Sequence, residues 1–278
     1  MKITLITCFK DPGKLLKETL KSVLYQNYGI SDPLQFEYII IDGASTDGSV
    51  GMVKSMMSGI PCTIVTEPDT GLYDGLHKGL TMASGDLIGY LNAGDMLFPN
   101  ALETVSDVFS QTDCLWISAY STISNEKKQP WRISIPYRFR NRFFENGIHG
   151  TFLPTLQQES TFWRAGLMQG IDWDLFRALK LAGDFYLWQH FSSKVGPPKI
   201  LHSLVGSFCA HPNQLSHDNI GYTRELLSLC RRPFFYEWPL AFLDRLMRIA
   251  PVGLKKRLAP RDHIIFDPGN SSWRYYER

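Results

Sequence analysis

The chain has 278 residues, of which 44% are hydrophobic and 20% are charged, and its formal net charge at pH 7 is +2. This composition predicts a folded globular protein with a sizeable hydrophobic core and excludes a disordered chain. A net charge this small does not favour binding to nucleic acid, so no nucleic-acid partner is expected.

Strands and helices alternate along the first 120 residues. Short apolar runs predict buried strands at residues 3–8, 36–42, 62–66, 86–91 and 113–120. Capping residues and the helical spacing of apolar side chains predict helices that start at Asp11-Pro12, at Ser45–Asp47, near residue 72 and near residue 99. This alternation is typical of an α/β fold, in which a doubly wound, mostly parallel sheet carries helices on both faces.

The pattern changes after residue 125. Basic and aromatic side chains are interleaved first, and the expected elements then follow as helix, strand and helix at residues 160–195, 198–209 and 219–230. We expect one domain over residues 1–220, with halves at 1–120 and 121–220, and a helical C-terminal extension at 221–278.

Three polar residues fall at the carboxyl ends of predicted strands, namely Thr7, Asp42 and Asp95. Ligands of doubly wound sheets bind beyond these ends, so the three residues should converge. The small residues after Asp42 allow a ligand to approach the backbone. Asp95 closes the turn that starts at Asn92, and a divalent cation on a diphosphate takes one or two such carboxylates. The same residues also suit ordinary turns and helix caps, and both interpretations stay open here.

Glycines recur every fourth residue in the predicted third helix, at Gly71, Gly75 and Gly79, with Asp74 and Lys78 among them. Glycines at a helix start allow close contact with a phosphate. They equally allow a helix to pack closely on the sheet, and the residues alone do not separate the two.

The order of these segments resembles family 2 glycosyltransferases, which have the GT-A fold. The resemblance consists of a strand ending in Asp42, a small-residue turn up to Gly48, the glycine-containing helix, the Gly85-Asp86 strand start and the turn at 92–95. That turn stands where the family has its metal-binding DxD motif. Asn92 and Gly94 replace carboxylates there, so Asp95 alone keeps the charge.

Three later segments resemble a bacterial subgroup that builds surface polysaccharide or lipopolysaccharide. Residues 157–164 resemble its acceptor-side segment, 181–188 its catalytic-base segment, and 211–216 its closing loop. The resemblance covers roughly residues 1–220, with 1–120 as the nucleotide-sugar-binding half and 121–220 as the acceptor-side half.

The resemblance implies an inverting, metal-dependent glycosyltransferase. It would move a sugar from a UDP- or GDP-sugar to a hydroxyl of a glycan or lipid-linked acceptor, with Mn²⁺ or Mg²⁺ as cofactor. One general base suffices for such a displacement, and Asp184 matches its position. The implied metal ligands are Asp95 and His211. The implied donor-binding residues are Thr7, Asp42, Gly71, Asp74, Lys78 and Asn92. The implied ligands of the acceptor or the donor sugar are Gln158, Glu159, Trp163 and Arg164.

Residues 231–260 are rich in aromatic and basic side chains, with acids only at Glu237 and Asp244. An amphipathic segment of this kind suits the surface of an anionic membrane. Packing on the core or across a homodimer interface explains the pattern equally well, and the sequence leaves the three open.

Cysteine usage and hydropathy bear on location. The five cysteines are scattered without a Cys-x-x-Cys pair, which argues against a disulfide scaffold or a structural zinc site. The first apolar run is too short for a signal peptide, and no run approaches the roughly 18 apolar residues of a membrane-spanning helix. We expect a cytoplasmic protein, at most peripheral on the inner face of the cytoplasmic membrane.

Two alternative functions are compatible with the same expected sheet. A catalytically degenerate nucleotide-sugar-binding protein would explain the reduced metal motif. A sugar nucleotidyltransferase would need a glycine-rich basic loop after the first strand, and residues 9–14 contain one glycine, which disfavours it.

Overall fold

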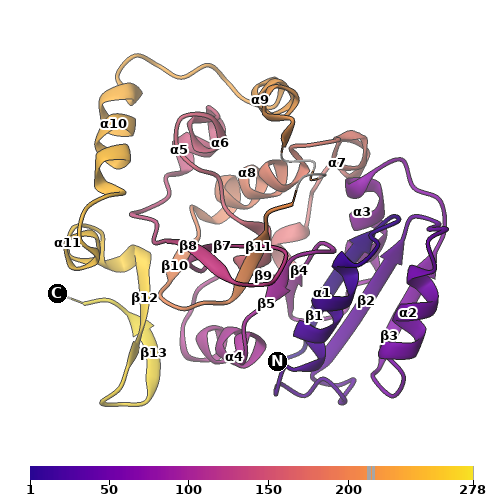
Figure 1. Cartoon of the computed structure of the whole chain (residues 1–278). Coiled ribbons are helices and arrows are strands. Elements are labelled where there is room, and N and C mark those ends of the chain that lie inside the picture. The colour runs from indigo at the N-terminus through magenta and orange to yellow at the C-terminus, as the bar shows by residue number, and fades with distance from the viewer. Residues whose placement is uncertain (212–213, 215–216, 278) are drawn as a thin grey trace.

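The computed structural model describes residues 1–211, 214 and 217–277 (Figure 1). Strands and helices alternate in its first part in the following order: β1 (Ile3–Phe9), α1 (Leu15–Leu24), β2 (Phe36–Asp42), α2 (Ser49–Met56), β3 (Cys62–Thr66), α3 (Leu72–Met82), β4 (Leu87–Tyr90), β5 (Met96–Leu97), α4 (Ala101–Gln111) and β6 (Trp116–Ser118).

The second part begins with a hairpin and ends with another. Its elements are β7 (Ser121–Ser124), β8 (Pro130–Ser134), α5 (Asn141–Glu145), α6 (Ile148–Thr151), β9 (Thr161–Arg164), α7 (Trp173–Ala178), α8 (Gly183–Val195), β10 (Lys199–Leu201), β11 (Gly206–Cys209), α9 (Asn219–Ser228), α10 (Glu237–Met247), α11 (Val252–Leu258), β12 (His263–Asp267) and β13 (Ser272–Tyr275).

The main sheet has nine strands in the order β13-β12-β10-β6-β9-β4-β1-β2-β3, and five of its eight neighbouring pairs are parallel. A smaller sheet has the order β5-β11-β7-β8. The predicted mostly parallel α/β fold is confirmed. Strands β13 and β3 form the two edges, so the C-terminal hairpin lies at the opposite side from β3 (Figure 1).

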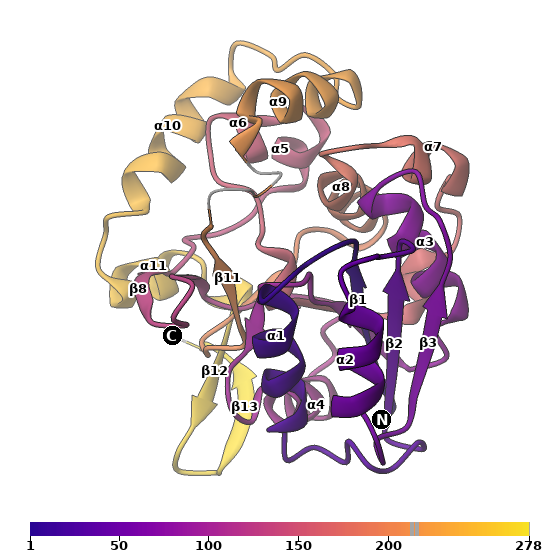
Figure 2. The ribbon, with the colours of Figure 1, turned by 45° about the vertical axis from the view of Figure 1, so that its right-hand side comes forward.

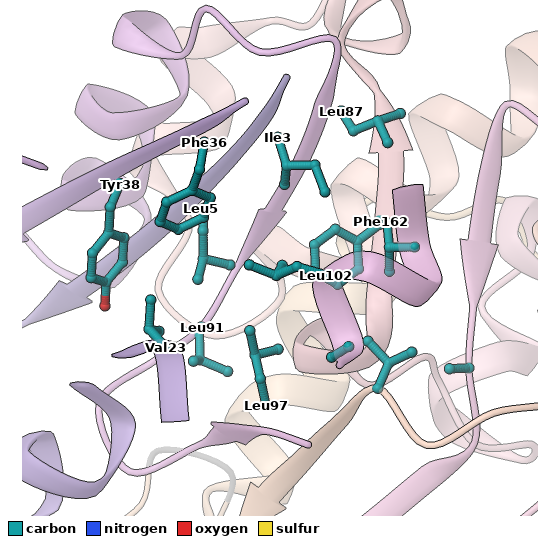
Figure 3. Packing of buried hydrophobic residues seen from close by; sticks show 14 of the residues in the cluster. Ile3, Leu5, Val23, Phe36, Tyr38, Leu87, Leu91, Leu97, Leu102 and Phe162 are labelled. Carbon is teal, nitrogen blue, oxygen red and sulfur yellow. The ribbon is translucent and has the colours of Figure 1, made fainter. Parts of the chain in front are cut away.

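Side-chain alternation along the strands divides the core between the two faces of the sheet. In β1, Ile3 and Leu5 face helices α1, α2 and α4, while Ile6 and Cys8 face α3, α7 and α8. Figure 3 shows Leu5 and Phe36 among the buried side chains of the first face, and Figure 2 shows α1 and α2 on the same side of the sheet. Helices on both faces were predicted, and this layer order confirms them.

The long helix predicted at 160–195 is wrong in its first part. Residues 161–164 form β9, which lies antiparallel between β4 and β6 in the middle of the sheet. Phe162 and Trp163 point to opposite faces, as consecutive strand residues do. Gly89 of β4 leaves room for this strand, because a Cβ there would overlap the ring of Phe162. After a short 3-10 turn at Ala165–Met168, the α-helical part of the segment begins only at α7.

Two other local predictions need correction. The strand predicted at 198–209 is two strands, because the chain leaves the main sheet after β10 and joins the smaller sheet as β11. Helix α1 begins at Leu15 rather than at Asp11-Pro12. The carboxylate of Asp11 is engaged elsewhere, since it accepts a 2.7 Å hydrogen bond from the backbone N–H of Thr46.

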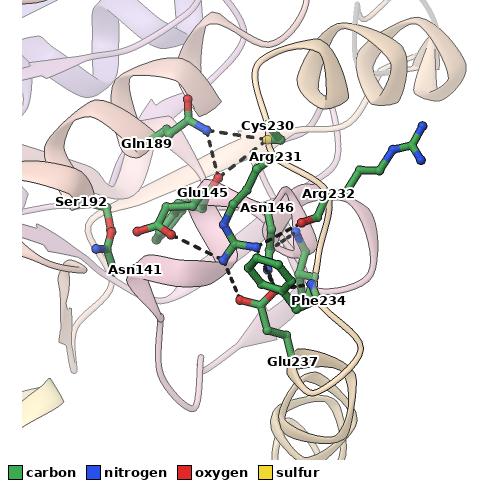
Figure 4. A network of polar contacts seen from close by, with 12 residues as sticks. Asn141, Glu145, Asn146, Gln189, Ser192, Cys230, Arg231, Arg232, Phe234 and Glu237 are labelled. Carbon is green, nitrogen blue, oxygen red and sulfur yellow. Dashed lines mark hydrogen bonds and ion pairs between the residues drawn. The ribbon is translucent and has the colours of Figure 1, made fainter.

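The C-terminal extension contains the expected helices, α10 and α11, and then a hairpin that its composition did not indicate. Strand β12 pairs in parallel with β10 of the main sheet. The division of the chain at residue 220 stays a prediction. An ion pair between Arg231 and Glu237 fixes the start of α10, and Asn146 contacts the same carboxylate (Figure 4). Among the described residues, no helix is long and apolar enough to cross a membrane.

Candidate active site

A cleft of about 870 Å³ opens at the carboxyl ends of β1 and β4. Its walls come from the loop after β1, the turn after β4, the residues before β9, and the starts of α8 and α9. Five of the residues predicted from the sequence line it together: Asn92, Asp95, Gln158, Asp184 and His211. The main sheet therefore gathers candidate ligands that lie more than 100 residues apart.

The carboxylate of Asp95 is buried and held on both oxygens. Oδ1 accepts a 2.9 Å hydrogen bond from the backbone N–H of Cys209, and Oδ2 accepts one of 2.8 Å from the Gln158 amide. Loss of solvent raises the pKa of Asp95 to about 7, although these hydrogen bonds favour the ionised form. A positive charge brought into the cleft would shift this carboxyl toward its ionised form.

The turn that presents Asp95 is fastened to α1. Gly94 has a φ of 107°, a conformation that side-chain-bearing residues rarely adopt. Its N–H donates to the hydroxyl of Thr19, and that hydroxyl donates a 2.7 Å bond to the carbonyl of Asp95. Asn92 Oδ1 in the same turn is buried without a hydrogen-bond partner in the described chain. The turn thus offers an unpaired oxygen to the cleft.

Asp184 lies in the first turn of α8, where the helix dipole favours a negative charge. Its Oδ1 accepts a 2.7 Å hydrogen bond from the N–H of Phe185 and lies 3.4 Å from the hydroxyl of Tyr73. Desolvation in the cleft raises the pKa of Asp184 to about 6. The carboxyl is therefore ionised at neutral pH and is still basic enough to take a proton.

The loop before Asp184 is held by a residue that the sequence analysis missed. Glu225 of α9 accepts three backbone hydrogen bonds from this loop, of 2.8 Å from Lys180 and 2.6 Å each from Leu181 and Ala182. No sequence pattern marks it, because its role depends on α9 packing beside α8. Two lysines, Lys10 and Lys180, also line the cleft and were not singled out.

Glu159 lies beneath the cleft rather than in its wall. It is 1% exposed, and neither carboxylate oxygen has a partner of good hydrogen-bonding geometry among the described residues. Burial, and then the nearby Asp95, raise the pKa of Glu159 well above its usual value. Its buried placement beneath the wall does not fit the predicted direct contact with a sugar.

The other predicted donor-binding residues flank the cleft and do not line it. Thr7 is buried on the α1 side, where its hydroxyl bonds with that of Tyr38 at 2.9 Å. Asp42 is also buried, with Oδ1 accepting from Ser45 and Oδ2 without a partner in the described residues. Gly71 packs against the side chain of Lys180, which does line the cleft.

Asp74 and Lys78 are engaged within the protein. Asp74 accepts a hydrogen bond from the N–H of Thr70 and pairs with Arg177 at 3.2 Å. Lys78 bonds the carbonyl of Pro68 at 2.8 Å and lies 3.3 Å from Glu67. Direct contact of these residues with a donor stays a prediction.

Trp163 and Arg164 were expected to contact the acceptor or the donor sugar, and their positions do not allow this. Trp163 is 0% exposed and packs against Trp188 and Tyr90 inside the core. The guanidinium of Arg164 donates to the carbonyls of Phe109 and Cys114. Because these residues belong to a strand that runs away from the cleft, they cannot hold a sugar there.

The oxygens of Asp95 and Asn92 and the imidazole of His211 fit a hard divalent cation that takes its remaining ligands from a diphosphate and water. The described residues contain no group of three His, Cys, Asp or Glu side chains that could hold a metal ion by themselves. Of the predicted closing loop, residues 212, 213, 215 and 216 lie outside the described residues.

Comparison with known proteins agrees with this architecture. The sequence model described as "Glycosyl transferase family 2" matches residues 4–161. An uncharacterized glycosyltransferase of Nostoc sp. is 25% identical over 119 residues, which are 42% of this chain and 35% of that protein. One of Mycobacterium tuberculosis is 38% identical over 80 residues, 29% of each chain. The alignments span about a third of the length of these curated relatives.

Solved structures share the fold at low sequence identity. Residues 1–349 of S. aureus TarS in complex with UDP-GlcNAc superpose with a TM-score of 0.58 at 14% identity, covering 94% of this chain and 71% of that one. A mannosyltransferase of Pyrobaculum calidifontis in complex with GDP-Man and Mn²⁺ superposes with a TM-score of 0.58 at 15% identity. This match covers 92% of this chain and 78% of the mannosyltransferase. The α/β architecture is thus of the GT-A-like type.

Proposed function

Because the chain belongs to glycosyl transferase family 2, we propose that it transfers a sugar from a nucleoside diphosphate sugar to a hydroxyl of a glycan or lipid-linked acceptor. The observation that carries the proposal is the placement of Asp95 and Asp184 in the walls of one cleft. The carboxyl of Asp95 suits the diphosphate end of a donor, and the carboxyl of Asp184 suits the reacting hydroxyl of the acceptor.

Asp184 would act as the general base. An acceptor hydroxyl loses its proton to the carboxylate as its oxygen attacks the anomeric carbon of the donor, and the bond from that carbon to the diphosphate breaks. A direct displacement of this kind inverts the anomeric configuration. The pKa of Asp184, about 6, suits this role at neutral pH.

The departing diphosphate needs positive charge. Lys10 and Lys180 line the cleft and can contact its oxygens. Asp95 and Asn92, together with His211 of the same cleft, would hold a Mn²⁺ or Mg²⁺ ion, which when bound stabilises negative charge on the leaving group. Support for metal use comes from family membership and from the Mn²⁺ in the Pyrobaculum structure.

The donor is proposed to be a UDP- or GDP-sugar, since solved structures of similar fold include complexes with UDP-GlcNAc, UDP and GDP-Man. The setting is proposed to be bacterial surface polysaccharide assembly. Its support is the resemblance of the second half to enzymes of that kind.

We further propose that α10 rests on the cytoplasmic surface of the cell membrane. The acids of this helix, Glu237 and Asp244, face inward, and their partners there are Arg231 and Arg140. The outer face is apolar: Trp238, Phe242, Leu243 and Leu246 are between 36% and 66% exposed. An apolar face bordered by exposed arginines matches an anionic lipid surface, although a second copy of the chain could cover it.

The test is a thermal-unfolding screen of UDP, GDP and their sugars, with and without Mn²⁺, followed by a turnover assay. A ligand that binds only the folded state raises the melting temperature. We expect one nucleotide to stabilise the protein in a Mn²⁺-dependent way and its sugar to be consumed. Stabilisation without any turnover would favour a catalytically degenerate nucleotide-sugar-binding protein. The replacement of carboxylates by Asn92 and Gly94 in the metal motif supports that alternative.

A further inference from the structure

A second cavity, of about 350 Å³, lies between the β7–β8 hairpin, residues 136–139 and helix α10. It shares Ile123, Thr155 and Gln157 with the cleft that holds Asp184, so the two spaces adjoin. Nothing in the proposed chemistry of the donor uses this cavity.

Positive charge is in excess around the cavity. Its wall contains three arginines, Arg132, Arg138 and Arg248, and one acid, Asp244. Asp244 is already neutralised by Arg140, which contacts both of its oxygens at 2.5 and 2.9 Å. Arg138 has an acid partner outside the cavity, Asp262 at 2.9 Å.

The two remaining arginines of the cavity wall have no acidic partner among the described residues. Among the described residues, neither Arg132 nor Arg248 forms an ion pair. Burial and then the positive charges of Arg132 and Arg245 lower the pKa of Arg248. These guanidinium groups therefore repel one another, and a bound anion would relieve the repulsion.

Strand β8 is arranged to point polar groups into the cavity. Arg132 and Ser134 alternate along the strand and line the cavity, whereas Trp131 and Ile133 do not, and Arg132 also remains exposed to solvent. Gln157 also contributes a buried Oε1 that has no hydrogen-bond partner in the described chain. The cavity thus combines unpaired cationic donors with a free acceptor.

We propose that this cavity binds an anionic group, a phosphate or carboxylate, of the sugar acceptor. The inference rests on the proposed function, because it assigns the adjoining cleft to the reaction. An acceptor seated in this way passes Gln157 and presents its hydroxyl to Asp184. Guanidinium groups suit such oxyanions because they donate several hydrogen bonds in one plane.

The location also favours an acceptor that is near a membrane. Helix α10 supplies Asp244 and, just after its end, Arg248 to the cavity, and its outer face is the apolar one. A phosphate on a lipid and a phosphate on a soluble sugar share the chemistry that the arginines recognise. The experiment must separate these two sources.

The test uses isothermal titration of the full chain with phenyl phosphate, in the presence of saturating UDP or GDP and Mn²⁺ so that the donor site is filled. We expect binding to the native protein and no binding of the uncharged benzyl alcohol. Arg132→Gln and Arg248→Gln should each weaken phenyl phosphate binding roughly tenfold, the value of one lost charged hydrogen bond. Arg142→Gln, an exposed arginine of α5, removes the same charge elsewhere and should change nothing.

Competition then identifies the source of the anion. If a short-chain phosphatidic acid displaces phenyl phosphate at a lower concentration than glucose 1-phosphate does, the source is a lipid phosphate, and the reverse order indicates a sugar phosphate. Either outcome supports the proposal, and displacement by neither contradicts it. Arg132 is exposed, so Arg132→Gln should fold even where Arg248→Gln does not, and thermal unfolding checks this.

The inference is overturned if phenyl phosphate does not bind the nucleotide-saturated protein, or if Arg142→Gln weakens binding as much as Arg132→Gln does. Failure of the proposed function looks different. In that case no nucleotide sugar is bound or consumed, whatever phenyl phosphate does.

Discussion

The side-chain amide of Gln158 donates a 2.8 Å hydrogen bond to Oδ2 of Asp95. This bond joins the turn after β4 to the segment that leads into β9, and the N–H of Cys209 holds the other oxygen from β11. The carboxylate is therefore fixed by both sheets before any ligand arrives. A fixed carboxylate is suited to a cation that must lie at one place on a diphosphate.

Replacing Asp95 should remove the metal dependence of nucleotide binding. In Asp95→Ala, the melting-temperature rise caused by UDP or GDP with Mn²⁺ should fall to the value measured in EDTA. Asp86→Ala is the matched control, because Asp86 is an exposed acid just before the other end of β4. A Mn²⁺-dependent rise that survives in Asp95→Ala would remove this residue from the metal site.

Glu225 should act as a positioning residue for Asp184. Glu225→Gln replaces an acceptor by a donor that faces backbone N–H groups, which should cost about 1–3 kcal/mol of unfolding free energy. A displaced loop should also lower kcat by roughly tenfold to a hundredfold. Nucleotide affinity should fall less than kcat does, because Lys180 is the one proposed diphosphate contact whose backbone Glu225 holds. Glu103→Gln, an exposed acid of α4, is the control for the loss of charge. If Glu225→Gln loses stability but keeps kcat, its role is structural only.

The first half of the fold follows from the sequence because each strand and helix there carries its own local signal. Asp95 was identified from its place after a predicted strand, Gln158 and Asp184 were identified through the resemblance, and the fold brings the three together. The second half did not follow, because β9 inserts between strands distant in sequence and its Thr-Phe-Trp-Arg run suits a helix or a strand. Glu225 was missed since its partners are backbone groups, which no residue pattern shows.

The Glu237 ion pair should make stability depend on acidic pH. Hydrogen bonds from Arg231, and then from Phe234 and Asn146, lower the pKa of Glu237 from 4.5 to about 2 (Figure 4). Its contribution is thus fully present above pH 4.5 and is lost as the pH falls through about 2. Urea unfolding should show Glu237→Gln less stable by on the order of 2 kcal/mol at pH 7 and a smaller difference at pH 3.

The control for this experiment is Glu18→Gln. Glu18 pairs with Lys21 at 2.8 Å, but both side chains are more than a third exposed. Its loss should change stability by about 0.5 kcal/mol or less. A pH-independent effect of Glu237→Gln would mean that packing, rather than the charge, fixes the start of α10.

The outer face of α10 should bind anionic membranes. The native chain should sediment with phosphatidylglycerol vesicles, and Phe242→Ser with Leu246→Ser should abolish this, because the variant removes the apolar area that inserts between headgroups. Leu34→Ser is the control, since Leu34 is 81% exposed in a distant loop. A native dimer that the double variant dissociates, together with no vesicle binding, would assign the face to a second copy instead.

The most direct test of the account is turnover by Asp184→Asn, which keeps the shape of the side chain and removes its basicity. With the nucleotide sugar found in the screen, we expect kcat to fall by roughly 10²–10⁴-fold. The Mn²⁺-dependent stabilisation by the nucleotide should persist, because the proposed role of Asp184 is toward the acceptor. Sugar transfer at the native rate by Asp184→Asn would contradict the proposed mechanism.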